Sequence, residues 1–163
     1  MPNLTKSQKR GKARAEVETK RQGGILWTRT APKNKDILLQ PFDKDVLNAI
    51  EGKEDMFVRE KEGTFYTITK DGMKVGITGF VHGSKKQPPF LTIGIIKKFR
   101  GKGFLAKAYK ELARKHGFKR VYVDIEKKNK ESIKAHAKTG FKVSTDDAGK
   151  NKFKTDIRMS KDY

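Results

Sequence analysis

The stretch Arg100-Gly101-Lys102-Gly103-Phe104-Leu105-Ala106 joins an apolar run at 90–96 to a segment with helical spacing at 103–116. Glycines at such a junction let the backbone approach a phosphate closely. The first free N–H groups of the helix and its positive dipole end then face the anion. Lys97 and Lys98 add positive charge just before the loop. The sequence therefore predicts a phosphate-binding loop at 100–106.

Two other nucleotide-binding motifs are alternatives for this loop. Gly101, Gly103 and Ala106 also fit the dinucleotide fingerprint, and Asp124 follows about 20 residues later, where that fold places a ribose ligand. A dinucleotide fold, however, turns at glycine directly from an apolar strand, whereas here the charged residues 97–100 intervene. The preceding strands also form a hairpin, which a parallel sheet does not need. The Walker A motif is excluded because no Gly-Lys pair is followed by Ser or Thr.

The periodicity of apolar residues predicts the elements around the loop. Residues 36–40 predict a strand, Asp43 caps a helix that continues to about residue 51, and alternating runs at 64–69 and 73–81 flank an Asp-Gly turn typical of a hairpin. We expect a more deeply buried strand at 90–96. The remaining elements are a helix at 103–116, a strand at 121–125, a helix at 129–139 and strands at 141–144 and 152–159. The helix at 103–116 has an apolar stripe at 3–4 spacing, formed by Leu105, Ala108, Tyr109, Leu112 and Ala113. This order predicts an α/β (α+β) fold, a mixed central sheet with helices on both faces.

Two ordered motifs in this region carry a family resemblance. The first is the loop at 100–106 after an apolar strand, and the second is Asn129 to Phe141, which reads N-K-E-S-I-K-A-H-A-K-T-G-F. Together they resemble the Gcn5-related N-acetyltransferases, the GNAT family, whose signature N-x-x-[A/S]-I-x-x-[Y]-x-K-x-G-F is matched at Asn129, Ser132, Ile133, Lys138, Gly140 and Phe141. The resemblance implies a GNAT-like acetyltransferase domain over residues 36–163 that uses acetyl-CoA (CoA) as its cofactor.

The resemblance also implies where the cofactor binds. The pyrophosphate would lie on the N–H groups of 101–106, and the pantetheine arm would lie where the strands at 90–96 and 121–125 splay apart. Asn129 would hydrogen-bond the cofactor arm, although a plain helix N-cap explains this residue equally well. The predicted cofactor-binding residues are Ile95, Ile96, Lys98, Arg100, Gly101, Lys102, Gly103, Phe104, Leu105, Ala106 and Asn129.

Two histidines are the candidate catalytic residues. In the family the proton donor to the departing thiolate is usually a tyrosine at the position of His136, and an imidazole can donate a proton near neutral pH. A packed histidine without that role is the alternative. His82 is the candidate general base, with an ordinary turn residue as the alternative. We expect Asp124 and Glu126 to pair with surface lysines, and backbone N–H groups at the end of the strand at 90–96 to form an oxyanion hole.

The composition excludes several other kinds of site. The 163 residues include no cysteine, which removes disulfides, thiolate zinc sites and a cysteine nucleophile. The three histidines are well separated, so we predict no metal site. No apolar run approaches the roughly 20 residues needed to cross a bilayer, and the first ten residues lack a signal core. We therefore expect a cytoplasmic protein with no membrane partner.

The formal charge of +20 is distributed unevenly along the chain. Residues 1–35 hold 10 basic and 2 acidic side chains and are predicted to form a basic N-terminal arm, whereas residues 36–96 are nearly neutral and residues 97–163 hold 21 basic and 8 acidic side chains. Such a balance attracts phosphates and acidic surfaces and repels polycationic partners. The arm would bind nucleic acid without sequence specificity.

The charge and the resemblance together predict an enzyme of the acyltransferase class. It would be an acetyl-CoA-dependent N-acetyltransferase whose amine acceptor lies on an acidic or nucleic-acid-associated molecule, either a protein or an aminoacyl-tRNA. The alternative is a catalytically weak or inactive GNAT-like basic protein that serves as a structural or binding component of a ribonucleoprotein or virion. Binding of acetyl-CoA separates the two hypotheses.

Overall fold

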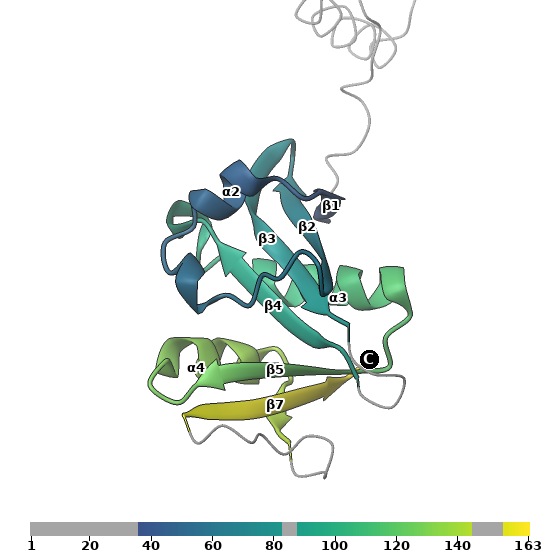
Figure 1. The fold of residues 1–163 in the computed structure, drawn as a ribbon, viewed down its shortest axis with the longest axis vertical. Coiled ribbons are helices and arrows are strands. Elements are labelled where there is room, and N and C mark those ends of the chain that lie inside the picture. The colour runs from purple at the N-terminus through teal and green to yellow at the C-terminus, as the bar shows by residue number, and fades with distance from the viewer. Residues whose placement is uncertain (1–35, 83–87, 145–154) are drawn as a thin grey trace, which may run out of the picture. The chain divides into compact units, whose positions relative to one another are not determined.

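The computed structural model describes residues 36–82, 88–144 and 155–163. The predicted arm at 1–35 and the first residues of the predicted strand at 152–159 lie outside these ranges. The described elements are seven strands, three α-helices and two 3-10 helices, with β2, β3 and β4 consecutive along the chain (Figure 1). They are β1 (Leu38–Pro41), α2 (Lys44–Asn48), the 3-10 helix η1 (Lys53–Asp55), β2 (Gly63–Lys70), β3 (Met73–Val81), β4 (Phe90–Ile95), the 3-10 helix η2 (Lys97–Phe99), α3 (Phe104–His116), β5 (Arg120–Glu126), α4 (Lys130–Lys138), β6 (Lys142–Val143) and β7 (Asp156–Asp162).

The strands form one seven-stranded mixed sheet in the order β1-β2-β3-β4-β5-β7-β6. Neighbouring strands run antiparallel except β4 and β5, which are parallel. Parallel neighbours need a long crossover connection, and α3 lies in the crossover between β4 and β5. The predicted mixed sheet with helices on both faces is therefore confirmed.

The hairpin of β2 and β3 forms where the sequence predicts it. Asp71 has φ of 50° and Gly72 has φ of 79°. Two successive positive φ values are typical of a type I′ turn, whose twist matches that of the flanking strands. The hairpin thus follows from local sequence.

One predicted helix and one predicted strand differ clearly from the structure. The helix capped by Asp43 ends at Asn48 instead of continuing to about residue 51, and Asp43 does cap it by accepting a hydrogen bond from the Asp45 amide (2.9 Å). The strand at 90–96 is only half-buried apart from Leu91, so the expectation of deep burial was wrong. The reason is that β5 diverges from β4 and leaves one edge of this strand uncovered.

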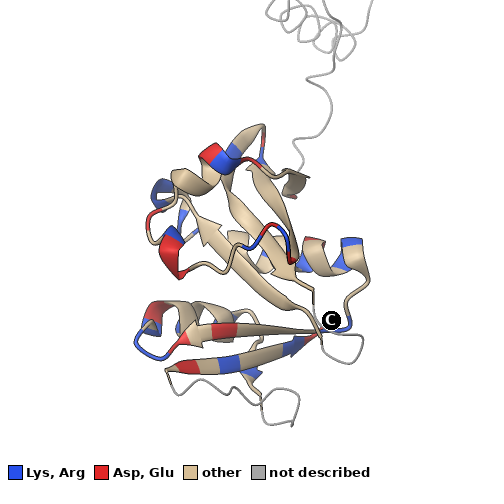
Figure 2. Cartoon of the chain, viewed as in Figure 1, with Lys and Arg blue, Asp and Glu red and all other residues tan. Residues whose placement is uncertain are grey.

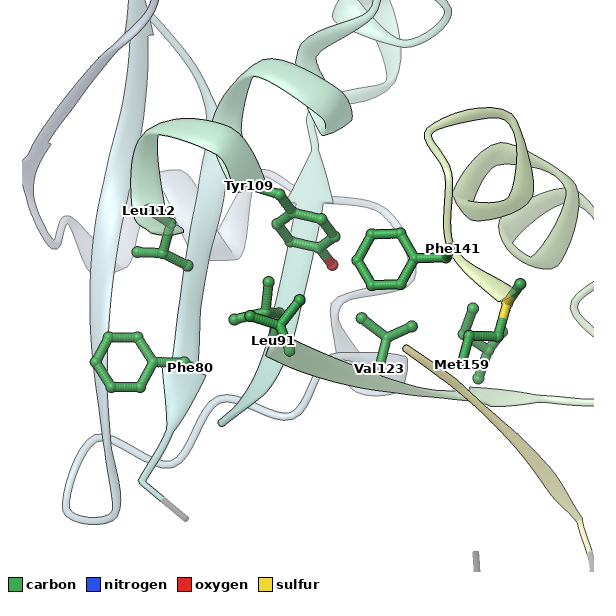
Figure 3. Packing of buried hydrophobic residues seen from close by; sticks show 9 residues of the cluster. Phe80, Leu91, Tyr109, Leu112, Val123, Phe141 and Met159 are labelled. Atoms are coloured by element: carbon green, nitrogen blue, oxygen red, sulfur yellow. The ribbon is translucent and has the colours of Figure 1, made fainter. Parts of the chain in front are cut away.

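The main hydrophobic core lies between the sheet and the helices α3 and α4 (Figure 3). Tyr109 and Leu112 of α3 pack there against Leu91 of β4 and Val123 of β5, and Phe141 closes the core after α4. A second cluster under the start of α3 contains Phe104 and Ala108. Both ends of α3 are thereby fixed against the sheet.

Charge is segregated among the described elements (Figure 2). The helix α2 and η1 carry side chains of both signs, whereas α3 holds four Lys or Arg residues and one Glu. The helix α4 and the turn before it are also basic. Their exposed cations are Lys127, Lys128, Lys130, Lys134 and Lys138.

Candidate functional site

The strands β4 and β5 pair with each other at one end and then diverge (Figure 1). Among the described residues their parallel pairing consists of Phe90 opposite Tyr122, with the Tyr122 amide donating to the Pro89 carbonyl (2.9 Å). On its other edge, β4 pairs with β3 along its whole length. The splay that the resemblance implied between these strands is therefore present.

The diverging edge of β4 exposes backbone polar groups toward β5. The Ile96 amide donates to the Val75 carbonyl (2.9 Å), and the Thr92 carbonyl accepts from the Thr78 hydroxyl (2.9 Å), so even-numbered residues direct their polar groups toward β3. Because these directions alternate along a strand, the N–H groups of Ile93 and Ile95 face β5. The Ile93 carbonyl faces the same way, whereas the Ile95 carbonyl accepts a hydrogen bond from Arg100 Nε. Of the two isoleucines predicted to bind the cofactor, Ile95 is thus the better placed.

The glycine loop presents open backbone amides. Gly101 and Gly103 have φ values of 74° and 79°, and no heavy atom lies within 4 Å of a Cβ built at either position. Within the described parts of the chain, the amides of Gly101, Lys102 and Gly103 donate to no recorded acceptor. The first N–H groups of α3 also lack partners within the helix. This cluster of amides beside the positive end of α3 fits a diphosphate.

Among the basic side chains around the glycine loop, Arg100 hydrogen-bonds to the protein, whereas Lys98 and Lys102 are exposed. Arg100 donates from Nε to the Ile95 carbonyl (2.9 Å) and from Nη2 to the Glu51 carbonyl (2.6 Å). Arg100 therefore positions the loop against β4. Lys98 and Lys102 are exposed, with their ammonium groups 5.0 and 5.8 Å from the Phe99 ring centroid.

The apolar residues in and before the glycine loop pack into the hydrophobic clusters. Phe104 is buried with 8% exposure, and Leu105 packs against the main core. Ile95 and Ile96 pack against different clusters, on α3 and on α2 respectively. These packed side chains hold the backbone on both sides of the glycine loop, whose amides at 101–103 are open.

Asn129 is the N-cap of α4. Its Oδ1 accepts a hydrogen bond from the Ser132 amide (3.1 Å), which confirms the N-cap interpretation. The side chain is exposed, so its predicted bond to the cofactor arm stays a prediction. A cap at this position also fixes the start of the helix that carries His136.

His136 is buried with 4% exposure and has a partner on each ring nitrogen. Its Nδ1 lies 2.8 Å from the Ser132 carbonyl oxygen, and its Nε2 lies 3.2 Å from Tyr109 Oη. Burial lowers the pKa of His136, partly offset by the bond to Ser132, and burial raises the pKa of Tyr109 well above its ordinary value. The sequence patterns had placed Tyr109 in an apolar helix stripe, and no local signal marked it as a functional residue.

His82 lies in a different part of the molecule. It follows the end of β3, where its Nε2 is 3.2 Å from the Thr64 hydroxyl and its ring packs edge-on against Phe80. The same neighbourhood contains His116, whose Nε2 is 2.9 Å from Tyr66 Oη. No recorded contact among the described residues brings His82 and His136 together, so His82 as general base stays a prediction.

The two acidic residues of β5 pair with cations on the sheet surface. Asp124 accepts two hydrogen bonds from Arg158 of β7 (2.7 and 2.8 Å), and Glu126 pairs with Lys128 (2.9 Å). The expectation of lysine partners holds for Glu126 and was wrong for Asp124. Arg158 also lies 4.5 Å from the Phe90 ring centroid and thus packs at the joined end of β4 and β5.

No group of three or more His, Cys, Asp or Glu side chains in the described ranges is arranged to hold a metal ion. Among those same residues, no helix has the length and apolar character that a membrane span requires.

The comparison with protein families decides the assignment. Residues 26–142 match the acetyltransferase (GNAT) domain family. The chain belongs to the GNAT family of acetyltransferases. The resemblance carried by the glycine loop and the Asn129 motif is thereby confirmed. No curated protein sequence matches the chain.

Solved structures support the fold of this GNAT domain. An acetyltransferase from Agrobacterium tumefaciens has a TM-score of 0.60 at 12% identity, covering 85% of this chain and 98% of its own. A Bacillus subtilis acetyltransferase in complex with CoA has a TM-score of 0.58 at 17% identity, covering 78% and 98%. The Campylobacter jejuni N-acetyltransferase PseH in complex with acetyl-CoA has a TM-score of 0.51 at 12% identity, covering 63% and 70%.

Proposed function

We propose that this GNAT protein transfers an acetyl group from acetyl-CoA to an amine on an acidic or nucleic-acid-associated acceptor. The observation that carries the proposal is the open amide cluster at Gly101 to Gly103 beside the divergence of β4 and β5. A phosphate-binding loop and an uncovered strand edge are the two features that a long diphosphate-containing thioester requires. Positioning two substrates together supplies much of the rate of such a transfer, with effective molarities of about 10⁵–10⁸ M.

The residues around the loop fit such a ligand. The amides of 101–106 would hold the diphosphate, with Lys98 and Lys102 as nearby cations. The backbone of Ile95 would bind the ligand along the open edge of β4, and Asn129 would contact its arm. When bound, acetyl-CoA supplies an activated acetyl group and a thiolate leaving group. The N–H groups of β4 that face β5 would serve as hydrogen-bond donors at the acetyl oxygen.

The surface charge supports the acceptor class. Lys130, Lys134 and Lys138 of α4 are exposed at intervals of four residues, which places them on one side of the helix. The described part of α4 contains one acidic residue, Glu131. A stripe of cations attracts polyanions and repels polycationic amines over a Debye length of about 8 Å at physiological salt. The predicted basic arm at 1–35 would add to this attraction.

A matched pair of glycine variants tests the proposal by calorimetric titration with acetyl-CoA. Gly103 and Gly117 lie at the two ends of α3, both with positive φ and both with open space at a Cβ. Their replacement by alanine introduces similar backbone strain. We expect Gly103→Ala to weaken acetyl-CoA binding at least about tenfold and Gly117→Ala to leave it within about twofold. Equal affinities for both variants would contradict binding at the loop.

A second candidate function is a GNAT-like basic binding protein without catalytic turnover. The observation that favours it is that both ring nitrogens of His136 already have partners within the protein. This hypothesis predicts undetectable binding of acetyl-CoA at millimolar concentration, together with RNA binding that weakens steeply with salt. The calorimetric titration of the unmodified chain therefore decides between the two functions.

A further inference from the structure

Three groups in the interior form a directed chain of hydrogen bonds. The Ser132 carbonyl can only accept, so the Nδ1 atom 2.8 Å away carries the proton of the His136 ring. In the neutral ring Nε2 is then an acceptor, and its partner at 3.2 Å, Tyr109 Oη, is the donor. The chain runs from the Tyr109 hydroxyl through the His136 ring to the Ser132 carbonyl.

This arrangement has the geometry of an activated hydroxyl. In hydrolases with a serine, histidine and carboxylate, the hydroxyl donates to Nε2 while an acceptor on Nδ1 fixes the tautomer and stabilises the imidazolium. Here the Ser132 carbonyl occupies the place of the acceptor on Nδ1. The Ser132 hydroxyl also lies 3.4 Å from Nδ1. A neutral His136 can therefore take the proton of Tyr109.

The Tyr109 hydroxyl is directed toward the diverging strands. Figure 3 shows it pointing from α3 toward the side chains of Leu91, Val123 and Phe141. Leu91 and Val123 each follow directly after the pair Phe90 and Tyr122, the point from which β4 and β5 separate. Tyr109 is 1% exposed, and it packs under the sheet beside the residues that follow the Phe90–Tyr122 pair, with His136 on α4 as the partner of its hydroxyl.

We propose that Tyr109 is a catalytic residue of the acetyl transfer and that His136 acts through it as a proton relay. This inference rests on the proposed function, since the thioester must lie between β4 and β5. It assigns the role of general base to His136 instead of His82, and it moves the group that contacts the substrates from α4 to α3. His136 is then a relay and positioning residue.

The relay balances the protons of the reaction. As the amine nitrogen bonds to the acetyl carbon, it gives a proton to Tyr109 Oη, which passes its own proton to His136 Nε2. As the bond between carbon and sulfur breaks, the electron pair stays on sulfur, His136 returns the proton to Oη, and Oη gives a proton to sulfur. The amine loses one proton and the sulfur gains one, so Tyr109 and His136 end in their initial states.

The surroundings keep His136 neutral in the resting protein. Burial lowers its pKa, and the Ser132 carbonyl offsets this only in part. Tyr109 of α3 faces the His136 ring, and Tyr163 after β7 interacts electrostatically with Tyr109. Lys161 of β7 donates to the Thr139 carbonyl (2.6 Å) at the end of α4. The contribution of Tyr163 is to raise the pKa of Tyr109 further.

The chain contains a matched control for this pair. Tyr66 Oη lies 2.9 Å from His116 Nε2, and the two side chains are at the opposite end of α3 from the glycine loop. Tyr66→Phe and Tyr109→Phe remove the same hydroxyl from the same kind of partner. A merely structural role for Tyr109 would produce similar effects in the two variants.

The test measures the acidity of the thiol of bound CoA from the ultraviolet absorbance of its thiolate. Because the relay requires Tyr109 Oη to turn its single proton from His136 Nε2 to the thiolate, we expect Tyr109→Phe to lower the acid dissociation constant of the bound thiol about tenfold. Tyr66→Phe should leave it unchanged. An unchanged constant in Tyr109→Phe, with CoA still bound, would overturn the relay and leave the proposed function intact. Absence of CoA binding to the unmodified chain would overturn both.

A second measurement on the unmodified chain needs no variant and no ligand. Nitrogen-15 NMR of the histidine rings distinguishes the two neutral tautomers. We expect His136 to carry its proton on Nδ1 at neutral pH. A proton on Nε2 would reverse the direction of the bond to Tyr109 and overturn the relay, whatever the activity of the protein.

Discussion

The chain contains two tyrosine–histidine pairs of nearly the same geometry in two different regions. Tyr109 Oη and His136 Nε2 are 3.2 Å apart in the main core, and Tyr66 Oη and His116 Nε2 are 2.9 Å apart beside the end of α3. The pairs differ in what surrounds them. The Ser132 carbonyl holds the other nitrogen of His136, whereas the His116 ring stacks on Phe118 at 5.5 Å and 19°.

The comparison separates hydrogen-bond geometry from function. Both histidines have a pKa lowered by burial, and for His116 the charges of Lys115 and His82 add to the effect. What distinguishes the pair of Tyr109 and His136 is that Tyr109 packs with Leu91 and Val123, next to the point where β4 and β5 separate. A tyrosine–histidine pair therefore becomes a candidate for proton transfer only where the fold brings a substrate to it.

The largest expected difference between the pairs is in turnover. We expect His136→Ala to slow thiol release from acetyl-CoA at least about 100-fold, because general acid–base groups contribute about 10²–10⁴-fold. His136→Tyr should retain more activity because it places a phenol at the position where the family usually has one. His116→Ala should react within about twofold of the unmodified chain. Equal rates for His136→Ala and His136→Tyr would contradict the assignment of a proton-transfer role to position 136.

A smaller difference is expected in stability. Tyr109→Phe leaves His136 Nε2 buried without its donor, which costs about 1–3 kcal/mol of the free energy of unfolding. Tyr66→Phe leaves His116 Nε2 partly accessible to water, so the cost should stay below about 1 kcal/mol. Urea unfolding of the two variants measures the difference. A lower free energy of unfolding for Tyr66→Phe than for Tyr109→Phe would contradict the expected penalty for the buried, unpaired nitrogen of His136.

Features set by local sequence could be predicted. The Asp-Gly turn, the helical stripe of α3 and the N-cap at Asn129 each depend on residues within a few positions of one another. The glycine loop was predicted for the same reason, because its amides belong to consecutive residues. Its two positive φ values are a conformation that glycine adopts readily.

The long-range contacts around the candidate site could not be predicted in this way. Tyr109 and His136 are 27 positions apart, and Asp124 and Arg158 are 34 apart. Their meeting depends on the crossover of α3 and on the placement of β7 between β5 and β6. A tyrosine in an apolar stripe carries no local sign of a polar partner, so the helical period alone classified Tyr109 as core.

The smallest and most diagnostic difference concerns the dependence of stability on pH. Burial lowers the pKa of His136 in the folded chain below its ordinary value of 6.5. Below pH 6.5 the unfolded chain therefore binds more protons than the folded chain, and the free energy of unfolding falls as the pH falls from 6.5 through the folded pKa. Above pH 6.5 this contribution is fully present.

Replacing each histidine by a neutral residue shows how much that histidine contributes to the pH dependence of the free energy of unfolding. We expect His136→Gln to flatten the decrease in stability below pH 6.5 more than His116→Gln, because His136 is the more deeply buried ring and desolvation is the largest cause of its lowered pKa. Urea unfolding at several pH values between 5 and 7 measures the two slopes. If His136→Gln left the slope unchanged, the pKa of His136 would not be lowered by burial, and a relay through a neutral ring would lose its physical basis.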